Sequence, residues 1–386
     1  MQISYKLITV LLVSMGIMVA SNIYTFIPIY GDIAASIGIP SESVVIAGSS
    51  FTLFYACGLL TFANVADRYG KREILILGML ASAFSTALVM VSFNSWSLFF
   101  TRGLQGFCLG SFAPVAFSYT YDLFSGKKRT LLLAMINSGF LFAGILGQLL
   151  SAGITRISHW TAVFLFFSII YLTLFLTGKR NLPQTAVSHD RAEMRTAAVI
   201  YRLLLNKQLL MLYGIVFTLL SSFVFYYDSL TRFLSGDDAL LLQTRLLGLL
   251  GVSLSLFTGW LFEKLGIYKT LFLGFALAVL SFCIAFIYLS VSSVPIFLMM
   301  SSILFVSSIS LLIPTVITLI GDISSEDRSQ ALSLYSFILL GGTSIAPLIA
   351  MKVSYAQALF LLAACFIVNV VIGIMLTFRK RLELKN

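Results

Sequence analysis

The chain has 386 residues, of which 59% are hydrophobic and only 10% are charged, and its mean hydropathy is +1.01. A soluble globular chain is typically ~45–50% apolar and ~25% charged, so a soluble protein, including one that binds nucleic acid, is excluded. With 7 Pro, 27 Gly and 4 Cys, collagen-like, disordered and disulfide-rich secreted chains are excluded as well. The composition predicts an all-α integral membrane protein, in which the formal net charge of +10 reports membrane orientation.

Apolar runs long enough to cross a bilayer recur along the whole chain. A hydrocarbon core of ~30 Å needs ~20 mostly apolar helical residues. The runs predict twelve transmembrane helices, at about 7–31, 43–66, 73–93, 96–121, 131–155, 160–178, 208–228, 239–262, 269–290, 294–320, 329–351 and 356–378. The polar segment 179–207 divides them into six and six, so we expect domains 1–178 and 208–386 joined by a cytoplasmic connector. Its 194–206 portion is expected to form an amphipathic helix on the membrane surface.

The positions of lysine and arginine predict how the helices are oriented. Most of the 25 basic residues fall near the two ends of the sequence or in even-numbered connectors. Because basic residues are enriched on the cytoplasmic side, we expect a multi-pass protein of the cell membrane with both termini in the cytoplasm. The exceptions are Arg156, Arg232 and Lys352 in the opposite connectors, and Arg102 and Arg245 within predicted helices.

Two loops of related sequence indicate an internal repeat. Between the second and third predicted helices lies Ala63-x-x-x-Asp67-Arg68-x-Gly70-Lys71-Arg72, and between the eighth and ninth lies Gly259-x-x-x-Glu263-Lys264-x-Gly266-x-x-Lys269. An acid, a base and a glycine at the same spacing in both halves favour a duplicated six-helix unit. Gly70 is expected to adopt a positive φ in a tight turn.

The first loop resembles the cytoplasmic signature of the major facilitator superfamily, G-x-x-x-D-R-x-G-R-[KR], although Ala63 replaces the leading glycine. The run Phe99-x-x-Arg102-Gly103-Leu104-Gln105-Gly106 resembles a motif of that family's twelve-span proton-coupled drug and metabolite efflux branch. The resemblance implies the major facilitator fold, with two pseudo-symmetric six-helix bundles. It also implies a cytoplasmic gate motif made of Asp67, Arg68, Gly70, Lys71, Arg72, Gly259, Glu263, Lys264 and Gly266. Ordinary positive-inside charge is the alternative interpretation of these basic residues.

Ionisable residues inside membrane helices are costly and by default mark a transport pathway. Arg102 and Arg245 lie within predicted helices, and Asp228 ends the seventh. We hypothesise that Asp228, perturbed by Arg245 or Arg102, is the protonation site that couples substrate release to proton entry. Asp32 is the rival protonation site, and a structural salt bridge at the outer gate is the alternative role for Asp228. The remaining candidate cavity residues are Gln105, Asn22, Tyr24, Asn137 and Tyr227.

The sequence contains no cluster of residues typical of an enzyme, a nucleotide-binding loop or a metal site. The driving force is therefore expected to come from an ion gradient or from the substrate itself, and the resemblance implies a proton gradient, without a cofactor. The leading prediction is a secondary transporter that exports drug-like or amphipathic small molecules by proton antiport and alternating access. The alternative is a transporter of an anionic metabolite such as a siderophore or an organic acid, which two arginines would suit. The expected partners are a small-molecule substrate and membrane lipids but no nucleic acid, and the chain is expected to be a monomer.

Overall fold

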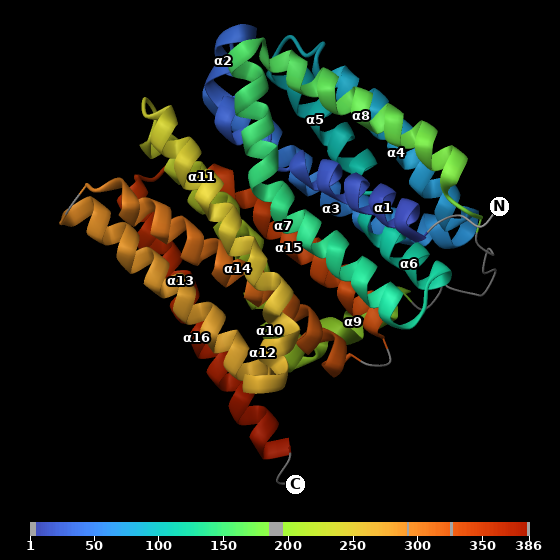
Figure 1. Cartoon of the computed structure of the whole chain (residues 1–386), viewed down its shortest axis with the longest axis vertical. Coiled ribbons are helices and arrows are strands. Elements are labelled where there is room, and N and C mark those ends of the chain that lie inside the picture. The colour runs from blue at the N-terminus through green and yellow to red at the C-terminus, as the bar shows by residue number, and fades with distance from the viewer. Residues whose placement is uncertain (1–4, 185–195, 292, 325–326, 384–386) are drawn as a thin grey trace. The chain divides into compact units, whose positions relative to one another are not determined.

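The computed structural model describes residues 5–184, 196–291, 293–324 and 327–383, except for a few side chains within the helices. These residues form helices and turns and contain no strand, which confirms the all-α prediction. The chain divides into two compact units, Met1–Ala192 and Glu193–Asn386 (Figure 1). The predicted domain boundaries at residues 178 and 208 stay a prediction. The helix that contains residue 178 continues beyond it, to Asn181.

Unit one consists of helices packed side by side around a largely apolar interior. Its elements are α1 (Tyr5–Ser21), η1 (Ile27–Ile29), α2 (Tyr30–Ile37), α3 (Ser41–Tyr69), α4 (Lys71–Val89), α5 (Ser95–Leu109), α6 (Ala113–Leu123), α7 (Gly126–Ile157) and α8 (Trp160–Asn181). Polar residues fix some of the helix starts. Asn94, for example, accepts a hydrogen bond from the backbone N–H of Ser97 at 2.8 Å and caps α5.

The first and fourth predicted transmembrane helices are each interrupted, so neither prediction of one continuous helix is right. The chain leaves the α-helix after Ser21 and forms turns before η1, and it does so again between α5 and α6. A proline follows each break, Pro28 in η1 and Pro114 at the second residue of α6. Proline lacks the N–H that continues the hydrogen-bond ladder, and its ring clashes with the carbonyl four residues earlier.

Glycines let α3 and α5 approach until their backbones touch. A Cβ on Gly106 would collide with the carbonyl oxygen of Phe51, and a Cβ on Gly110 would lie 2.8 Å from the Cα of Gly58. Small residues at a helix crossing permit this close approach, which is a common way to hold helices together in a membrane. The pair α3–α5 is therefore a tight structural core of unit one.

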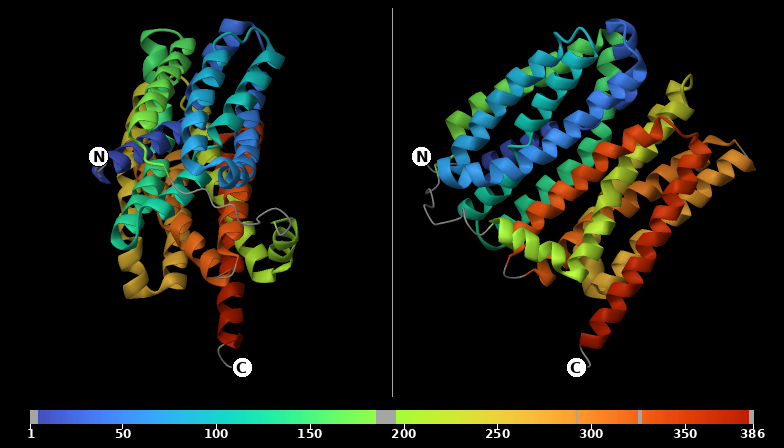
Figure 2. Two further views of the ribbon diagram at one scale, coloured as in Figure 1. Left: turned by 90° about the vertical axis from the view of Figure 1, so that its right-hand side faces the viewer. Right: turned by 180° about the vertical axis from the view of Figure 1, so that it is seen from behind.

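Unit two has the same general organisation. Its elements are α9 (Thr196–Leu205), α10 (Lys207–Phe233), α11 (Asp238–Val252), η2 (Ser253–Phe257), α12 (Thr258–Leu265), α13 (Ile267–Ser290), α14 (Pro295–Ile323), α15 (Arg328–Ala350) and α16 (Tyr355–Glu383). The last turns of α16 extend past the other helices of this unit (Figure 2). The eighth predicted span is also irregular, because η2 separates α11 from α12.

In the described part of the chain, 10 helices are long and apolar enough to cross a membrane. They correspond to all the predicted spans except the first and the fourth, and the two pieces of the first, Tyr5–Ser21 and Ile27–Ile37, are shorter apolar helices. The prediction of a multi-pass helical membrane protein is therefore confirmed. Its two interrupted segments are the places where backbone groups leave the regular helix and become available to other side chains.

Candidate functional site

Arg102 is the central residue of a polar network inside unit one. It lies on α5 and is fully buried. Its NH1 donates to Oε1 of Gln105 at 2.5 Å, and its NH2 donates to the backbone carbonyl of Asn22 at 3.2 Å. Asn22 is the first residue of the break after α1, so Arg102 binds a carbonyl that the helix has released. The sequence-predicted residues Arg102, Gln105 and Asn22 are thus in direct contact.

Three aromatic rings surround the Arg102 guanidinium. Its central carbon lies 4.1 Å from the ring centroid of Phe26, 4.2 Å from that of Phe51 and 5.7 Å from that of Phe164. Among the described residues no acid forms an ion pair with Arg102, and its Nε has no hydrogen-bond partner. Cation–π attraction and two neutral oxygens therefore hold this buried charge in place of a carboxylate.

The network continues through Gln105 and Asn22 to two further helices. Gln105 Nε2 donates to Oδ1 of Asn22 and to the hydroxyl of Thr86, both at 3.0 Å. Asn22 Nδ2 donates to the hydroxyl of Tyr171 at 2.5 Å. The break after α1 is thereby tied to α4, α5 and α8. Sequence reasoning missed Thr86 and Tyr171, because a single hydroxyl in an apolar helix carries no spacing signal.

The other candidates of unit one lie apart from these hydrogen bonds. Tyr24 is buried, at 3% exposure, in the turns that follow α1. The amide of Asn137 is half-buried and donates to the carbonyl of Leu133 in its own helix, at 3.0 Å. Asp32, the rival protonation site, lies in the first turn of α2 and is exposed.

Asp228 is a fully buried acid on α10 of unit two. Its Oδ1 accepts a hydrogen bond from Nε of Arg232 at 3.1 Å, one helical turn further along. Its Oδ2 is buried without a hydrogen-bond partner among the described residues. Arg232 was assigned to a connector from the sequence, but α10 continues to Phe233 and carries it. The i, i+4 spacing of acid and base was the signal that could have identified this pair.

Arg245 lies near this ion pair on α11. It is 2% exposed, and its NH2 donates to the hydroxyl of Thr231 on α10 at 2.7 Å. It is close enough to interact electrostatically with Asp228. Through Thr231, Arg245 contacts the same turn of α10 as Arg232, which is the direct partner of the Asp228 carboxylate. Arg102 belongs to unit one.

Tyr227 is buried beside Asp228 and bonds within its own unit. Its hydroxyl shares a hydrogen bond of 2.7 Å with that of Ser302, and the hydroxyl of Tyr226 shares one of 2.9 Å with that of Ser301. Two successive tyrosines of α10 thus bond to two successive serines of α14, and this arrangement fixes the direction in which the end of α10 presents Asp228.

The gate motif of unit one begins at a tight turn between α3 and α4. Gly70 has φ of 95°, as the sequence predicts, and such a φ is readily adopted only by glycine. Lys71 Nζ forms an ion pair with Oδ2 of Asp122 at the end of α6, at 2.7 Å. Arg68 is exposed, and the side chain of Asp67 lies outside the described part of the structure.

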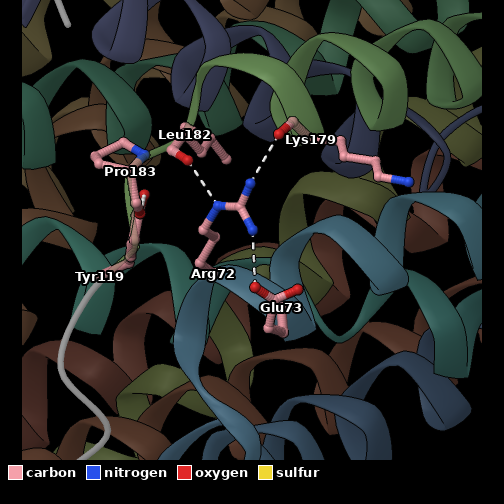
Figure 3. A network of polar contacts seen from close by, with 6 residues as sticks. All are labelled: Arg72, Glu73, Tyr119, Lys179, Leu182 and Pro183. Carbon is pink, nitrogen blue, oxygen red and sulfur yellow. Dashed lines mark hydrogen bonds and ion pairs between the residues drawn. The ribbon is translucent and has the colours of Figure 1, made fainter. Parts of the chain in front are cut away.

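Arg72 binds the carboxyl end of α8. Its Nε donates to the carbonyl of Leu182 at 2.6 Å and its NH2 to the carbonyl of Lys179 at 2.7 Å, while NH1 pairs with Glu73 at 2.7 Å (Figure 3). The last carbonyls of a helix have no partner within the helix and carry partial negative charge. The guanidinium group therefore works as a side-chain cap on α8.

Tyr119 adds a second attachment at the same place. Its buried side chain comes from α6, and its hydroxyl donates to the carbonyl of Pro183 at 2.5 Å (Figure 3). Helices α4 and α6 thereby both hold the first residues after α8. This attachment was not anticipated from the sequence, since the bonds go to backbone carbonyls.

The second copy of the motif, in unit two, makes different contacts. Gly266 repeats the positive φ, at 82°. Glu263 and Lys264 are exposed, and Lys264 Nζ lies 4.4 Å from the ring centroid of Trp260. Gly259 has open space around it. In the second copy Ile267 directly follows Gly266, where Lys71 follows Gly70 in the first, so Asp322 has no lysine opposite it at that position. The turn is repeated, but the ion pair is not.

The described residues contain no group of three His, Cys, Asp or Glu that could hold a metal ion. Long apolar helices in two units, with Arg102, Asp228 and Arg245 buried inside them, define the class as a multi-pass membrane protein with charged groups in its interior. A comparison with protein families agrees: the Major Facilitator Superfamily model matches residues 11–280 and 241–386. The chain belongs to this superfamily and is a transporter, not an enzyme.

Individual relatives are distant. A bicyclomycin resistance protein homolog of Haemophilus influenzae is 28% identical over 183 residues, which are 47% of this chain and 45% of the relative. Multidrug resistance protein D of Escherichia coli is 25% identical over 183 residues, or 47% and 46% of the two chains. The match thus spans about half the length of these curated relatives. An uncharacterized MFS-type transporter of Bacillus subtilis, YwfA, is 24% identical over 96% of this chain and 92% of its own.

Proposed function

We propose that the chain is a proton-coupled exporter that exchanges protons for drug-like or amphipathic small molecules by alternating access. Its place would be the cell membrane, with both termini in the cytoplasm, and it would work as a monomer with a proton gradient as energy source and without a cofactor. The names of its relatives support the substrate class, since they include bicyclomycin resistance and multidrug resistance proteins. The distribution of lysine and arginine supports the orientation.

The observation that carries the coupling proposal is the environment of Asp228. A carboxylate inside a membrane helix is costly and is kept where it pairs with a charge or exchanges a proton. One oxygen of Asp228 is bound to Arg232, and the other has no hydrogen-bond partner among the described residues. Protonation would break the ion pair and release Arg232. In the proposed cycle this release is the event that links proton entry to substrate movement.

In unit one, Arg102, Gln105 and Asn22 are proposed to bind the substrate. Arg102, Gln105 and Asn22 are already held in one network, so they form a preorganised polar surface at the break after α1. Tyr24, Asn137, Tyr227 and Arg245 are proposed as further cavity residues. The two motif loops would form the cytoplasmic gate, in which the Lys71–Asp122 pair is one closing contact.

The test is transport by the purified protein in proteoliposomes under an imposed pH gradient. The gradient is expected to drive accumulation of a lipophilic cation by the wild-type protein. Asp228→Asn, which keeps the shape but cannot exchange a proton at neutral pH, is expected to lose the response to the gradient and to retain substrate–substrate exchange. Asp32→Asn serves as the matched control, because Asp32 is exposed and is expected to leave the response unchanged.

Two results would contradict this proposal. An unchanged response in Asp228→Asn would remove the coupling role, and its loss in Asp32→Asn instead would move that role to the rival acid. Gradient-driven accumulation of a carboxylate but of no lipophilic cation would replace the proposed substrate class with an anionic one.

A further inference from the structure

Helix α9 is joined to the membrane-crossing helix α10 by a single residue. α9 ends at Leu205, α10 begins at Lys207, and the chain turns sharply between them (Figure 2). The side chain of Asn206 accepts hydrogen bonds from the N–H groups of Gln208 and Leu209, at 3.0 and 3.2 Å, and caps α10. The corner is therefore fixed. α10 is long and apolar enough to cross a membrane, so its first residue is expected near the membrane boundary, with the last turn of α9 directly beside it.

One side of α9 is covered by its own unit. Leu203 is 5% exposed, and α9 packs against α10 and α15. Arg202 forms an ion pair with Asp327, the residue that precedes α15. These contacts fix the rotation of α9 about its axis and so determine which side chains face outward.

The outward side of α9 is apolar. Tyr201 is 66% exposed, Leu204 37% and Leu205 63%. Large apolar side chains gathered on one face at a membrane boundary are typical of helices that lie in the interface with that face among the lipids. Tyrosine is enriched at this level because its ring is apolar and its hydroxyl stays hydrated. The exposed face of α9 thus has the composition of a membrane-surface helix.

Two basic residues flank this face. Arg202 is 63% exposed despite its pairing with Asp327, and Lys207 is exposed at the corner. The carboxylate of Asp327 is largely covered, with 20% exposure, so it contributes little negative charge to the outer surface. A positive edge next to an apolar face is complementary to a bilayer that carries anionic headgroups.

We propose that α9 binds the bilayer surface, with Tyr201, Leu204 and Leu205 inserted at the headgroup level and Arg202 and Lys207 bound to anionic lipid headgroups. The partner is the lipid surface itself. Through the Arg202–Asp327 pair and the rigid corner at Asn206, this contact fixes the start of α10 and α15 at the membrane boundary. The proposal requires only that α10 crosses the membrane, and it is independent of the direction of transport and of the coupling ion.

The experiment places one fluorophore on the full-length protein in lipid vesicles, on a background in which the four native cysteines are replaced by serine. The probe is attached at Leu205→Cys, or in a second variant at Tyr201→Cys. Aqueous iodide measures exposure to water, and phosphatidylglycerol or phosphatidylcholine with a quenching label measures contact with each lipid. Iodide is expected to quench the fluorophore only weakly. Labelled phosphatidylglycerol is expected to quench it more strongly than labelled phosphatidylcholine does. One basic residue contributes about fivefold to the local enrichment of an anionic lipid.

Two comparisons make the outcome decisive. Arg202→Gln with Lys207→Gln is expected to equalise quenching by the two lipids while iodide stays excluded. A probe at Val291, an exposed position after α13 with no lysine or arginine nearby in the sequence, is expected to show no lipid preference. Iodide quenching at 205 and 201 as strong as that of the free dye overturns the bilayer contact. Equal quenching by both lipids in the unmodified helix overturns the anionic-headgroup assignment.

Discussion

At the residue scale, Arg102 is unusual because it is a buried cation that pairs with no carboxylate in the described part of the chain. Two phenylalanine rings and two neutral oxygens take the place of the missing acid. This arrangement depends on the flat, forked guanidinium group, which stacks on rings and donates in two directions at once. A lysine has the same charge but neither of these properties, so the substitution tests whether shape or charge is required.

Arg102→Lys is expected to lower the free energy of unfolding by about 2 kcal/mol, because one hydrogen bond to a charged group and the ring stacking are lost. The loss is measured as a lower midpoint of thermal unfolding in detergent. Lys264→Arg, at an exposed ring contact in unit two, is the control and is expected to change nothing measurable. Equal stability of Arg102→Lys and wild type would mean that charge alone is required.

The cap on α8 gives a second residue-scale prediction. Arg72→Ala removes the donors of two hydrogen bonds to carbonyls and is expected to cost about 2 kcal/mol of unfolding free energy. Arg180→Ala, an exposed arginine in the same region, is expected to cost less than about 0.5 kcal/mol. Thermal midpoints of the two variants give the comparison. A similar loss in both would show that the loss reflects general surface charge.

At the element scale, the sequence predicted the number and order of the apolar segments but not where helices break. Pro114 and Pro314 are each followed eight residues later by an aspartate, Asp122 and Asp322, and are equivalent in the two halves of the chain. Yet a break precedes Pro114, while α14 continues through Pro314. A proline alone therefore does not determine a break. The segment before Pro114 contains Gly110, which α3 contacts through Gly58, and this packing cannot be seen in an apolar pattern.

The residues of the candidate site, like the helices, could be predicted from the sequence only in part. Buried charges such as Arg102 and Asp228 are visible in a sequence because they are rare in apolar segments. The groups that bind the charged residues were harder to predict. Arg232 was missed because the end of α10 was placed too early, and the carbonyls bound by Arg72 were missed because backbone groups carry no sequence signal. Geometry between helices depends on packing, which periodicity does not encode.

The contact between α3 and α5 gives an element-scale prediction. Gly106→Ala places a methyl group against the carbonyl of Phe51 and is expected to cost about 1–3 kcal/mol of unfolding free energy. Gly153→Ala on α7 meets nothing within 4 Å and is expected to be neutral or to stabilise by up to about 1 kcal/mol. The thermal midpoint is expected to fall in Gly106→Ala and to stay unchanged or rise in Gly153→Ala. A neutral Gly106→Ala would show that the two backbones can separate.

At the scale of the whole molecule, the two units share a repeated sequence but use it differently. Both loops turn at a glycine of positive φ, whereas the Lys71–Asp122 ion pair has no counterpart in the described part of unit two, because Ile267 stands where unit one has Lys71. The turn is thus preserved as a feature of the fold. If the loops form the proposed gate, the two are therefore expected to contribute unequally to it.

The orientation of the molecule is tested with single cysteines at the two ends of α13. Lys264 and Lys269 lie near one end, and the other end, near Val291, has no basic residue, so Val291 is expected outside the cell and Glu263 inside. In intact cells an impermeant maleimide is expected to label Val291→Cys and to leave Glu263→Cys unlabelled until the cells are opened. The reverse pattern would place the termini outside.

The glycine contact between α3 and α5 also provides a fixed reference within unit one. Because Gly58 and Gly110 leave no gap between the two backbones, neither helix can rotate about its long axis without striking the other. Spectroscopic labels placed one on each helix should therefore keep a constant separation throughout turnover. Any change in distance from this pair to a third helix can then be assigned to the third helix, which makes α3–α5 the natural internal frame for measuring motion.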